Sequence, residues 1–110
     1  MSIARLEING AIASIIINRP NAMNALGQDG DGDAFMAACD EINADKSIRA
    51  TILTGEGKAF SAGGDLKAMR DKTGNFSGSP AEIADSYRNN IHKIIKSLWN
   101  LETPLISAIN

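Results

Sequence analysis

The sequence contains little cysteine, and neither acidic nor basic residues are in large excess. Its single cysteine, Cys39, excludes an internal disulfide framework and suits a reducing compartment. The 13 acidic and 11 basic residues nearly cancel, so no electrostatic argument supports binding to nucleic acid or to an anionic membrane. The longest apolar runs are far too short to span a bilayer, and the N-terminus lacks the basic segment and apolar core of a signal peptide. These absences predict a soluble, cytoplasmic protein.

The 110 residues, 44% of them hydrophobic, suffice for one small domain or for part of a larger one. Residues 3–18 predict a β-hairpin. Asn9-Gly10 is the preferred pair for a two-residue type I′ turn, and such a turn would pair Ile8 with Ala11. The second strand, residues 12–17, is apolar on both faces and is therefore expected to be buried on both sides.

Helices and further strands follow the hairpin. Apolar residues at helical spacing predict a helix over about residues 33–43, with its first residue as the N-cap. Residues 48–54 predict a strand. Ser79-Pro80-Ala81-Glu82 combines a capping box with proline at the first helical position, and the apolar stripe after it predicts one helix over residues 79–102. Residues 105–109 predict another buried strand, and this order of elements indicates an α/β fold without a linker between domains.

The most informative stretch is Gly57–Met69, GKAFSAGGDLKAM, which follows a strand and precedes a short helix. Only small residues occupy positions 61–64, and small side chains leave backbone N–H groups accessible. Such groups at a helix N-terminus attract negative charge. In catalysis the same geometry stabilises an oxyanion that forms only in the transition state. The carboxylate of Asp65 is expected to interact with free N–H groups at the start of the helix and not to act as a general base.

Gly57–Met69 resembles the first signature of the enoyl-CoA hydratase/isomerase (crotonase) superfamily. Asn18–Leu26 is similar to the family's first coenzyme A loop, and Thr103–Asn110 is similar to the strand before its second oxyanion-hole loop. The resemblance covers the chain from end to end and implies the crotonase-like spiral of ββα turns. It also implies that residues 1–110 are the N-terminal portion of a single crotonase-like domain, because the family's second oxyanion donor and usual catalytic carboxylates would follow Asn110.

The resemblance assigns roles to particular residues. It implies a catalytic role for the backbone N–H of Gly64, as one half of the oxyanion hole that stabilises the enolate of an acyl-CoA thioester. It further implies that the two matching loops bind the substrate through Asn21, Ala22, Ala62, Gly63, Gly64, Asp65 and Leu66. Many family members have a basic residue where Asn21 stands, so a charged contact to a phosphate is not expected there. No metal and no cofactor are implied, because the coenzyme A thioester is itself the substrate.

The commonest reaction of the family is hydration of a 2-enoyl-CoA to a 3-hydroxyacyl-CoA, and we expect this activity of the complete enzyme. The alternatives are another crotonase reaction (isomerisation, dehalogenation or decarboxylation) and a truncated, non-catalytic crotonase-like fragment. The resemblance also implies a homo-trimer or hexamer of the full-length protein and an acyl pocket bordered by residues 71–82. The 110-residue chain alone is expected to lack the catalytic carboxylates.

Two competing motifs fit less well. Residues 29–33, DGDGD, look like the first half of a calcium loop, but Ala34 and Asp40 stand where the loop requires Gly and Glu. Residues 54–58 resemble part of a P-loop, but Ala59 replaces its Ser or Thr. His92, the only histidine, lies at the boundary of the apolar stripe and receives no catalytic role.

Overall fold

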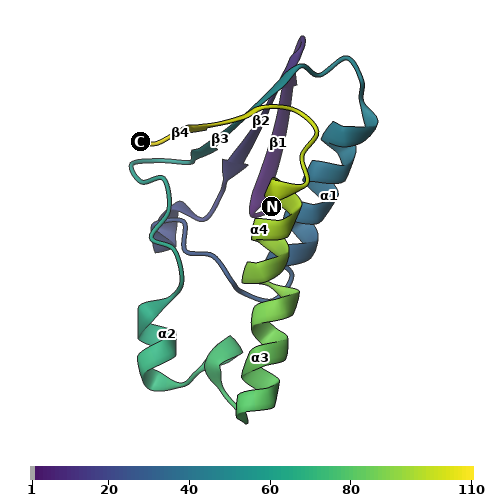
Figure 1. The fold of residues 1–110 in the computed structure, drawn as a ribbon. Coiled ribbons are helices and arrows are strands. Elements are labelled where there is room, and N and C mark those ends of the chain that lie inside the picture. The colour runs from purple at the N-terminus through teal and green to yellow at the C-terminus, as the bar shows by residue number, and fades with distance from the viewer. Residues whose placement is uncertain (1) are drawn as a thin grey trace.

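Residues 2–110, which the computed structural model describes, form one four-stranded sheet in the order β1-β2-β3-β4 (Figure 1). The hairpin strands β1 and β2 are antiparallel, and the pairs β2–β3 and β3–β4 are parallel. The strands are β1 (Ala4–Asn9), β2 (Ile12–Ile17), β3 (Ala50–Gly55) and β4 (Leu105–Ala108). The helices are η1 (Pro20–Ala22), α1 (Asp31–Ala44), α2 (Leu66–Asp71), η2 (Gly74–Phe76), α3 (Pro80–Asn89) and α4 (Ile91–Trp99). Helical connections between the parallel strands confirm the predicted α/β fold.

The hairpin turns one residue later than the sequence predicts. Gly10 and Ala11 form the two-residue turn, so Ile8 pairs with Ala13 and the predicted pairing with Ala11 is wrong. Of the two turn residues only Gly10 has a positive φ, 62°, which is the pattern of a type II′ turn with glycine in the first central position. Each β1 residue therefore pairs with a β2 residue two positions further along the chain than predicted. Because side chains alternate between the two faces of a sheet, a shift of two positions leaves every side chain on its expected face.

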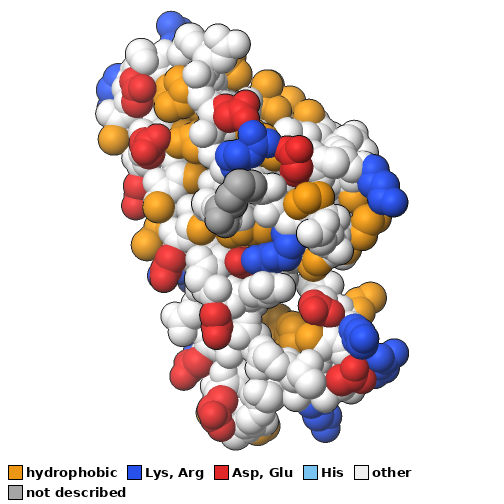
Figure 2. All heavy atoms as spheres, turned by 180° about the vertical axis from the view of Figure 1, so that it is seen from behind, with side chains coloured by type: hydrophobic (Ala, Val, Ile, Leu, Met, Phe, Trp, Pro, Cys, Tyr) orange, Lys and Arg blue, Asp and Glu red, His pale blue; other side chains and the backbone are white. Residues whose placement is uncertain are grey.

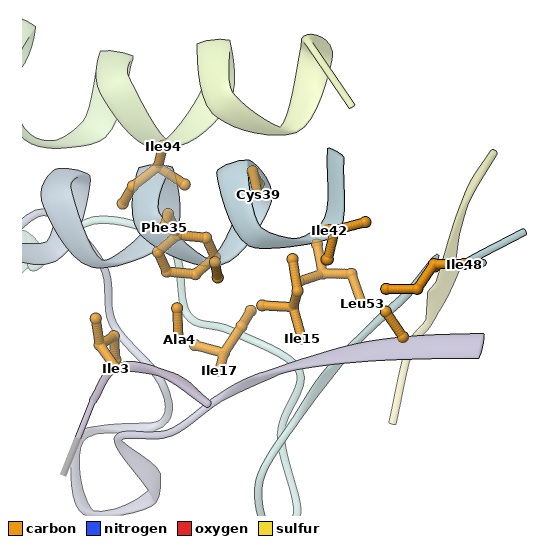
Figure 3. Close-up of a cluster of buried hydrophobic side chains, with 12 residues drawn as sticks. Ile3, Ala4, Ile15, Ile17, Phe35, Cys39, Ile42, Ile48, Leu53 and Ile94 are labelled. Carbon is orange, nitrogen blue, oxygen red and sulfur yellow. The ribbon is translucent and has the colours of Figure 1, made fainter. Parts of the chain in front are cut away.

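The hydrophobic core lies between the sheet and α1. Figure 3 shows α1 lying between the sheet and α4, with Ile15 and Ile17 of β2 directed toward Phe35 and Ile42 of α1. These four side chains are fully buried. Ile16, which alternation places on the opposite face of β2, is also buried. The strand is therefore covered on both sides at residues 15–17, whereas Ile12 at its start is 38% exposed, so the prediction is confirmed for only part of the strand.

Helix α1 begins at Asp31, two residues before the predicted start. Its N-cap is Gly30, with a φ of 89°, and the predicted N-cap, Asp33, lies inside the first turn. The carboxylate of Asp31 accepts hydrogen bonds from the backbone N–H groups of Gly27 and Gln28, at 3.0 and 2.9 Å. Asp31 therefore closes the preceding turn, whereas the carboxylate of Asp33 forms an ion pair with Lys93 of α4.

The long helix predicted over residues 79–102 is two helices, α3 and α4, separated at Asn90. The backbone of Asn90 leaves the helical region, with φ −121° and ψ −87°. Its buried side-chain amide donates to the Ser86 carbonyl at 3.2 Å and lies 3.4 Å from a carboxylate oxygen of Asp29. Asparagine competes with helical backbone geometry through bonds of this kind, which accounts for the break.

The predicted start of α3 is confirmed in detail. The hydroxyl of Ser79 accepts a hydrogen bond from the N–H of Glu82 at 3.2 Å, and the Glu82 carboxylate accepts one from the N–H of Ser79 at 3.1 Å. The hydrogen bond from the backbone N–H of Ser79 to the carboxylate, with a smaller contribution from the Ser79 side chain, lowers the pKa of Glu82 from its usual value. Pro80 takes the first helical position, where no N–H donor is needed.

Strand β4 is exposed along its whole length, so the prediction of a buried strand there is wrong. Within residues 2–110 it pairs only with β3 and forms the edge of the sheet. The nearby side chain of Trp99 at the end of α4 is also exposed, at 86%. No helix in this described range has the length and apolar character needed to cross a bilayer.

Helices α1 and α4 approach closely at Gly32, which is buried. A Cβ atom added to Gly32 would lie 2.3 Å from the carbonyl oxygen of Asn89 and 2.9 Å from Cβ of Lys93. Real Cβ atoms essentially never approach other atoms so closely, and a backbone carbonyl cannot rotate away as a flexible side chain would. The absence of a side chain at position 32 therefore allows α1 to lie close to the last residue of α3, Asn89, and to Lys93 of α4.

We predict that Gly32→Ala lowers the free energy of unfolding by about 1–2 kcal/mol, as measured by urea denaturation. Overpacking costs about 1–3 kcal/mol, and contact with a fixed backbone carbonyl places this site in the upper part of that range, at about 2–3 kcal/mol. The better helix propensity of alanine returns about 1 kcal/mol of this. Ala37→Ser, which adds one atom to the exposed side of the same helix, is the matched control and should change stability by no more than about 0.5 kcal/mol. Equal stability of Gly32→Ala and the wild type would contradict the close approach.

Candidate functional site

Two loops that are far apart in sequence lie side by side beyond the ends of β2 and β3. The backbone N–H of Ala62 donates to the carbonyl of Met23, and the N–H of Leu26 donates to the carbonyl of Gly63, both at 2.8 Å. Parallel strands end at the same edge of a sheet, so the loops after β2 and β3 emerge as neighbours. The fold therefore brings together Asn18–Leu26 and Gly57–Met69, two stretches that resemble coenzyme A and oxyanion-hole segments.

The fully buried side chain of Asn24 joins these two loops. Its amide oxygen accepts a hydrogen bond from the N–H of Arg19 at 2.7 Å, and its amide nitrogen donates to the carbonyls of Glu56 and Ala59 at 3.0 and 2.8 Å. The backbone carbonyl of Asn24 also accepts a hydrogen bond from the Ser61 hydroxyl at 2.7 Å. The sequence analysis assigned no separate role to Asn24. The signal that could have indicated such a role is its position between an Arg-Pro turn and an apolar residue.

The third stretch of resemblance reaches the same place through Asn110. Its side-chain amide donates to the carbonyls of Gly55 and Gly57, at 2.9 and 2.7 Å. Gly55 ends β3, and Gly57 opens the glycine-rich loop. All three stretches that carry the family resemblance therefore meet at one edge of the sheet.

A buried ion pair between Arg19 and Asp31 holds the outer side of the first loop. The guanidinium donates to both carboxylate oxygens, at 3.0 and 2.8 Å, and to the carbonyl of Ala25 at 2.6 Å. Asp29 and Asp33 instead contact Asn90 and Lys93. The aspartates of the calcium-like motif are thus directed to different partners. Among residues 2–110 no group of three His, Cys, Asp or Glu side chains is placed to hold a metal ion.

The turn before α2 leaves the backbone at Gly64 accessible. Gly63 has a φ of 80°, and its N–H donates to the Ser61 hydroxyl at 3.0 Å. The N–H of Gly64 donates to no other group within residues 2–110. The carboxylate of Asp65 accepts a hydrogen bond from the N–H of Ala68 at 3.0 Å, so Asp65 caps α2 as predicted. The turn therefore leaves the backbone N–H of Gly64 unpaired, just before the start of α2.

A largely apolar pocket opens beside this turn, and we call it the Gly64 pocket. Its cavity volume is about 30 Å³, within about 300 Å³ of unfilled space that includes open solvent. Figure 2 shows hydrophobic side chains inside a recess in the lower part of that view. The pocket is lined by Leu26, Gly27, Gly64, Met69, Asn75, Phe76, Ser86, Tyr87 and Ile91. None of these residues is acidic, so the lining combines an apolar surface with the backbone of Gly64 and contains no carboxylate for proton transfer.

The predicted substrate-binding residues divide into two groups. Gly64 lies in the wall of the Gly64 pocket. The remaining candidates lie outside its lining, on the two paired loops and the start of α2; they are Asn21, Ala22, Ala62, Gly63, Asp65 and Leu66. All of these except the half-buried Gly63 are exposed. The arrangement gives a surface made of small residues next to an apolar recess.

Cys39 and His92 take no part in the site. Cys39 lies in the core on α1, and burial, with a smaller contribution from the charge of Asp40, raises the pKa of its thiol to about 11. His92 is exposed on α4, with its ring centroid 5.7 Å from that of Tyr87. A buried thiol with a raised pKa is mostly inert.

The raised pKa of Cys39 makes its reactivity a test of the core. A shift from 9.0 to about 11 lowers the thiolate fraction at pH 8 about a hundredfold. We therefore expect iodoacetamide to alkylate the native chain at least ~100-fold more slowly than the urea-unfolded chain at the same pH. Native and unfolded rates of similar size would place Cys39 outside the core.

A mixed sheet with a glycine-rich turn and two asparagine-bound loops at one edge has the architecture of the crotonase fold. An enoyl-CoA hydratase from Bacillus anthracis is 25% identical and superposes with a TM-score of 0.80, covering 99% of this chain and 40% of that one. An enoyl-CoA hydratase/carnithine racemase from Magnetospirillum magneticum is 29% identical, with a TM-score of 0.79, and the match covers 99% of this chain and 39% of that one.

The chain belongs to the enoyl-CoA hydratase/isomerase family, because the sequence model of that family matches residues 7–110. It is 36% identical over 108 residues to the short-chain-enoyl-CoA hydratase of Clostridium acetobutylicum, a match that covers 96% of this chain and 38% of that protein. A probable enoyl-CoA hydratase of Mycobacterium tuberculosis is 34% identical over 104 residues, which are 94% of this chain and 37% of that protein. The chain thus spans less than two fifths of the length of these curated relatives. The homo-trimer or hexamer and the cytoplasmic location stay predictions.

Proposed function

We propose that residues 1–110 supply the coenzyme A loops and one oxyanion donor of an enoyl-CoA hydratase, which adds water to a 2-enoyl-CoA to give a 3-hydroxyacyl-CoA. The observation that carries the proposal is the N–H of Gly64, which is unpaired within residues 2–110 on a turn that borders an apolar pocket. Relatives whose names state enoyl-CoA hydratase activity support the choice of reaction.

In the proposed reaction the thioester carbonyl gains negative charge as the enolate forms. A preorganised backbone donor stabilises this charge, and one such donor is worth about 3–4 kcal/mol of the barrier. The apolar lining of the Gly64 pocket strengthens the interaction, because charges and dipoles interact more strongly where the dielectric constant is low. No cofactor is needed in this proposal, since the thioester itself carries the reacting carbonyl.

Coenzyme A would lie along the paired loops outside the pocket. Ala22, Ala62 and Gly63 have small side chains, which allow another molecule to approach the backbone closely. Asn21, Asp65 and Leu66 are exposed on the same loops and at the start of α2. In this arrangement the carrier lies on the surface while the acyl group enters the recess beside Gly64.

Hydration also needs a general base to activate water and a general acid to protonate the substrate carbon. The lining of the Gly64 pocket contains no acidic residue. We therefore expect purified residues 1–110 to show no hydration of crotonyl-CoA. A chimera that joins these residues to the part of the Clostridium acetobutylicum relative following the match should regain activity. Robust turnover by residues 1–110 alone would show that the chemistry does not need further carboxylates.

The role of Gly64 can be tested in such an active chimera by two substitutions. Gly64→Pro removes the N–H, and we expect kcat to fall about 10²–10³-fold from loss of the donor alone. Gly64→Ala keeps the N–H and should be milder. Position 64 is outside the left-handed region, and the added Cβ would meet only the terminal methyl of Met69, 2.7 Å away on a flexible side chain. Circular dichroism and coenzyme A binding serve as controls for folding. Near-wild-type kcat in a folded Gly64→Pro protein would remove Gly64 from the mechanism.

A further inference from the structure

Tyr87 lines two separate hollows. One is the Gly64 pocket. The other, which we call the outer groove, is open to solvent and is lined by Pro80, Ile83, Ala84, Tyr87, Arg88 and His92. Of the described residues, Tyr87 alone belongs to both linings. Its side chain is half-buried, as expected for a partition between an interior recess and the surface.

Neighbouring rings hold Tyr87 in this position. Phe76, which lines only the Gly64 pocket, meets Tyr87 edge to face, with ring centroids 5.8 Å apart and an interplanar angle of 71°. His92, which lines only the outer groove, has its ring centroid 5.7 Å from that of Tyr87. Edge-to-face contact is a favoured aromatic geometry. Tyr87 therefore contacts one ring from the pocket lining and one from the groove lining, and it lies where the two linings meet.

We infer that Tyr87 limits the length of the acyl chain that the Gly64 pocket accepts. This inference rests on the proposed function, which places the thioester carbonyl at Gly64. From there an acyl chain runs along the apolar lining until it meets the Tyr87 ring. A short chain can lie against this lining in the partly open recess up to the ring, whereas the additional methylenes of a longer chain must displace the ring or stay in water.

Removal of the ring should join the pocket to the outer groove. Ile83 and Ala84 give the groove an apolar surface on which further methylenes can be buried. Each methylene that leaves water for such a surface improves binding by about fourfold. The wild-type protein should therefore discriminate little between chains that end at Tyr87 and longer chains, and a protein without the ring should favour longer chains.

The experiment measures dissociation constants of coenzyme A, butyryl-CoA and octanoyl-CoA by isothermal titration calorimetry with the full 110-residue chain. In the wild type, octanoyl-CoA should bind no more than about threefold more tightly than butyryl-CoA. This ratio is smaller than the gain of about fourfold in affinity that one buried methylene provides. In Tyr87→Ala, octanoyl-CoA should bind at least about tenfold more tightly than butyryl-CoA. Tyr87→Phe keeps the ring and should keep the wild-type ratio. Ile83→Ala, which changes the outer groove alone, is the matched control and should keep that ratio as well.

The outcomes separate this inference from the proposed function. If the wild type binds coenzyme A and butyryl-CoA but Tyr87→Ala has the wild-type ratio, Tyr87 does not set chain length and the proposed function stands. A wild type that already prefers octanoyl-CoA about tenfold would show that the pocket is open past the ring. If the wild type binds none of the three compounds, the proposed function fails and this inference with it. Tyr87→Leu, which shortens the side chain and keeps it apolar, decides the same question should the alanine variant not fold.

Discussion

The buried amide of Asn24 is the interaction on which the candidate site depends. It bonds one loop at Arg19 and the other at Glu56 and Ala59, and no donor or acceptor of this side chain is left unpaired. A buried amide without partners would be strongly unfavourable, so the two loops are stable only in the relative position that satisfies it. That position also allows the direct backbone hydrogen bonds between residues 23–26 and 62–63.

The same hydrogen bonds explain why Gly64 remains available. Around it, Ala62, Gly63 and Ala68 all use their N–H groups within the protein. The turn then continues into α2, whose first N–H groups have no partners in the preceding turn of helix. Gly64 lies between the paired part of the loop and the capped helix, at the edge of an apolar recess. An unpaired donor in such surroundings is suited to a developing negative charge, because no rearrangement is needed when the charge appears.

Local rules in the sequence predicted those features that depend on a few neighbouring residues. The capping box at Ser79, the cap at Asp65 and the buried strand at residues 15–17 all follow from short patterns and are confirmed. The order of elements and the meeting of the three similar stretches were also accessible, because the family resemblance supplied the fold that local patterns leave open. The roles of Gly64 and of the substrate-binding residues stay predictions, since no ligand contact tests them.

Tertiary contacts decided what the sequence alone did not. The break at Asn90 depends on its burial beside Asp29, 61 residues away, whereas the apolar stripe through this region favoured a single helix. The start of α1 depends on Asp31, which turns toward Arg19 and the preceding loop and so leaves the N-cap position to Gly30. The sequence by itself determined the element types and the glycine-rich turn, because these arise from spacing and local backbone preferences. Only the tertiary structure decided the helix break, the exposure of β4 and the placement of Tyr87 between two hollows, because each depends on which distant residues lie opposite.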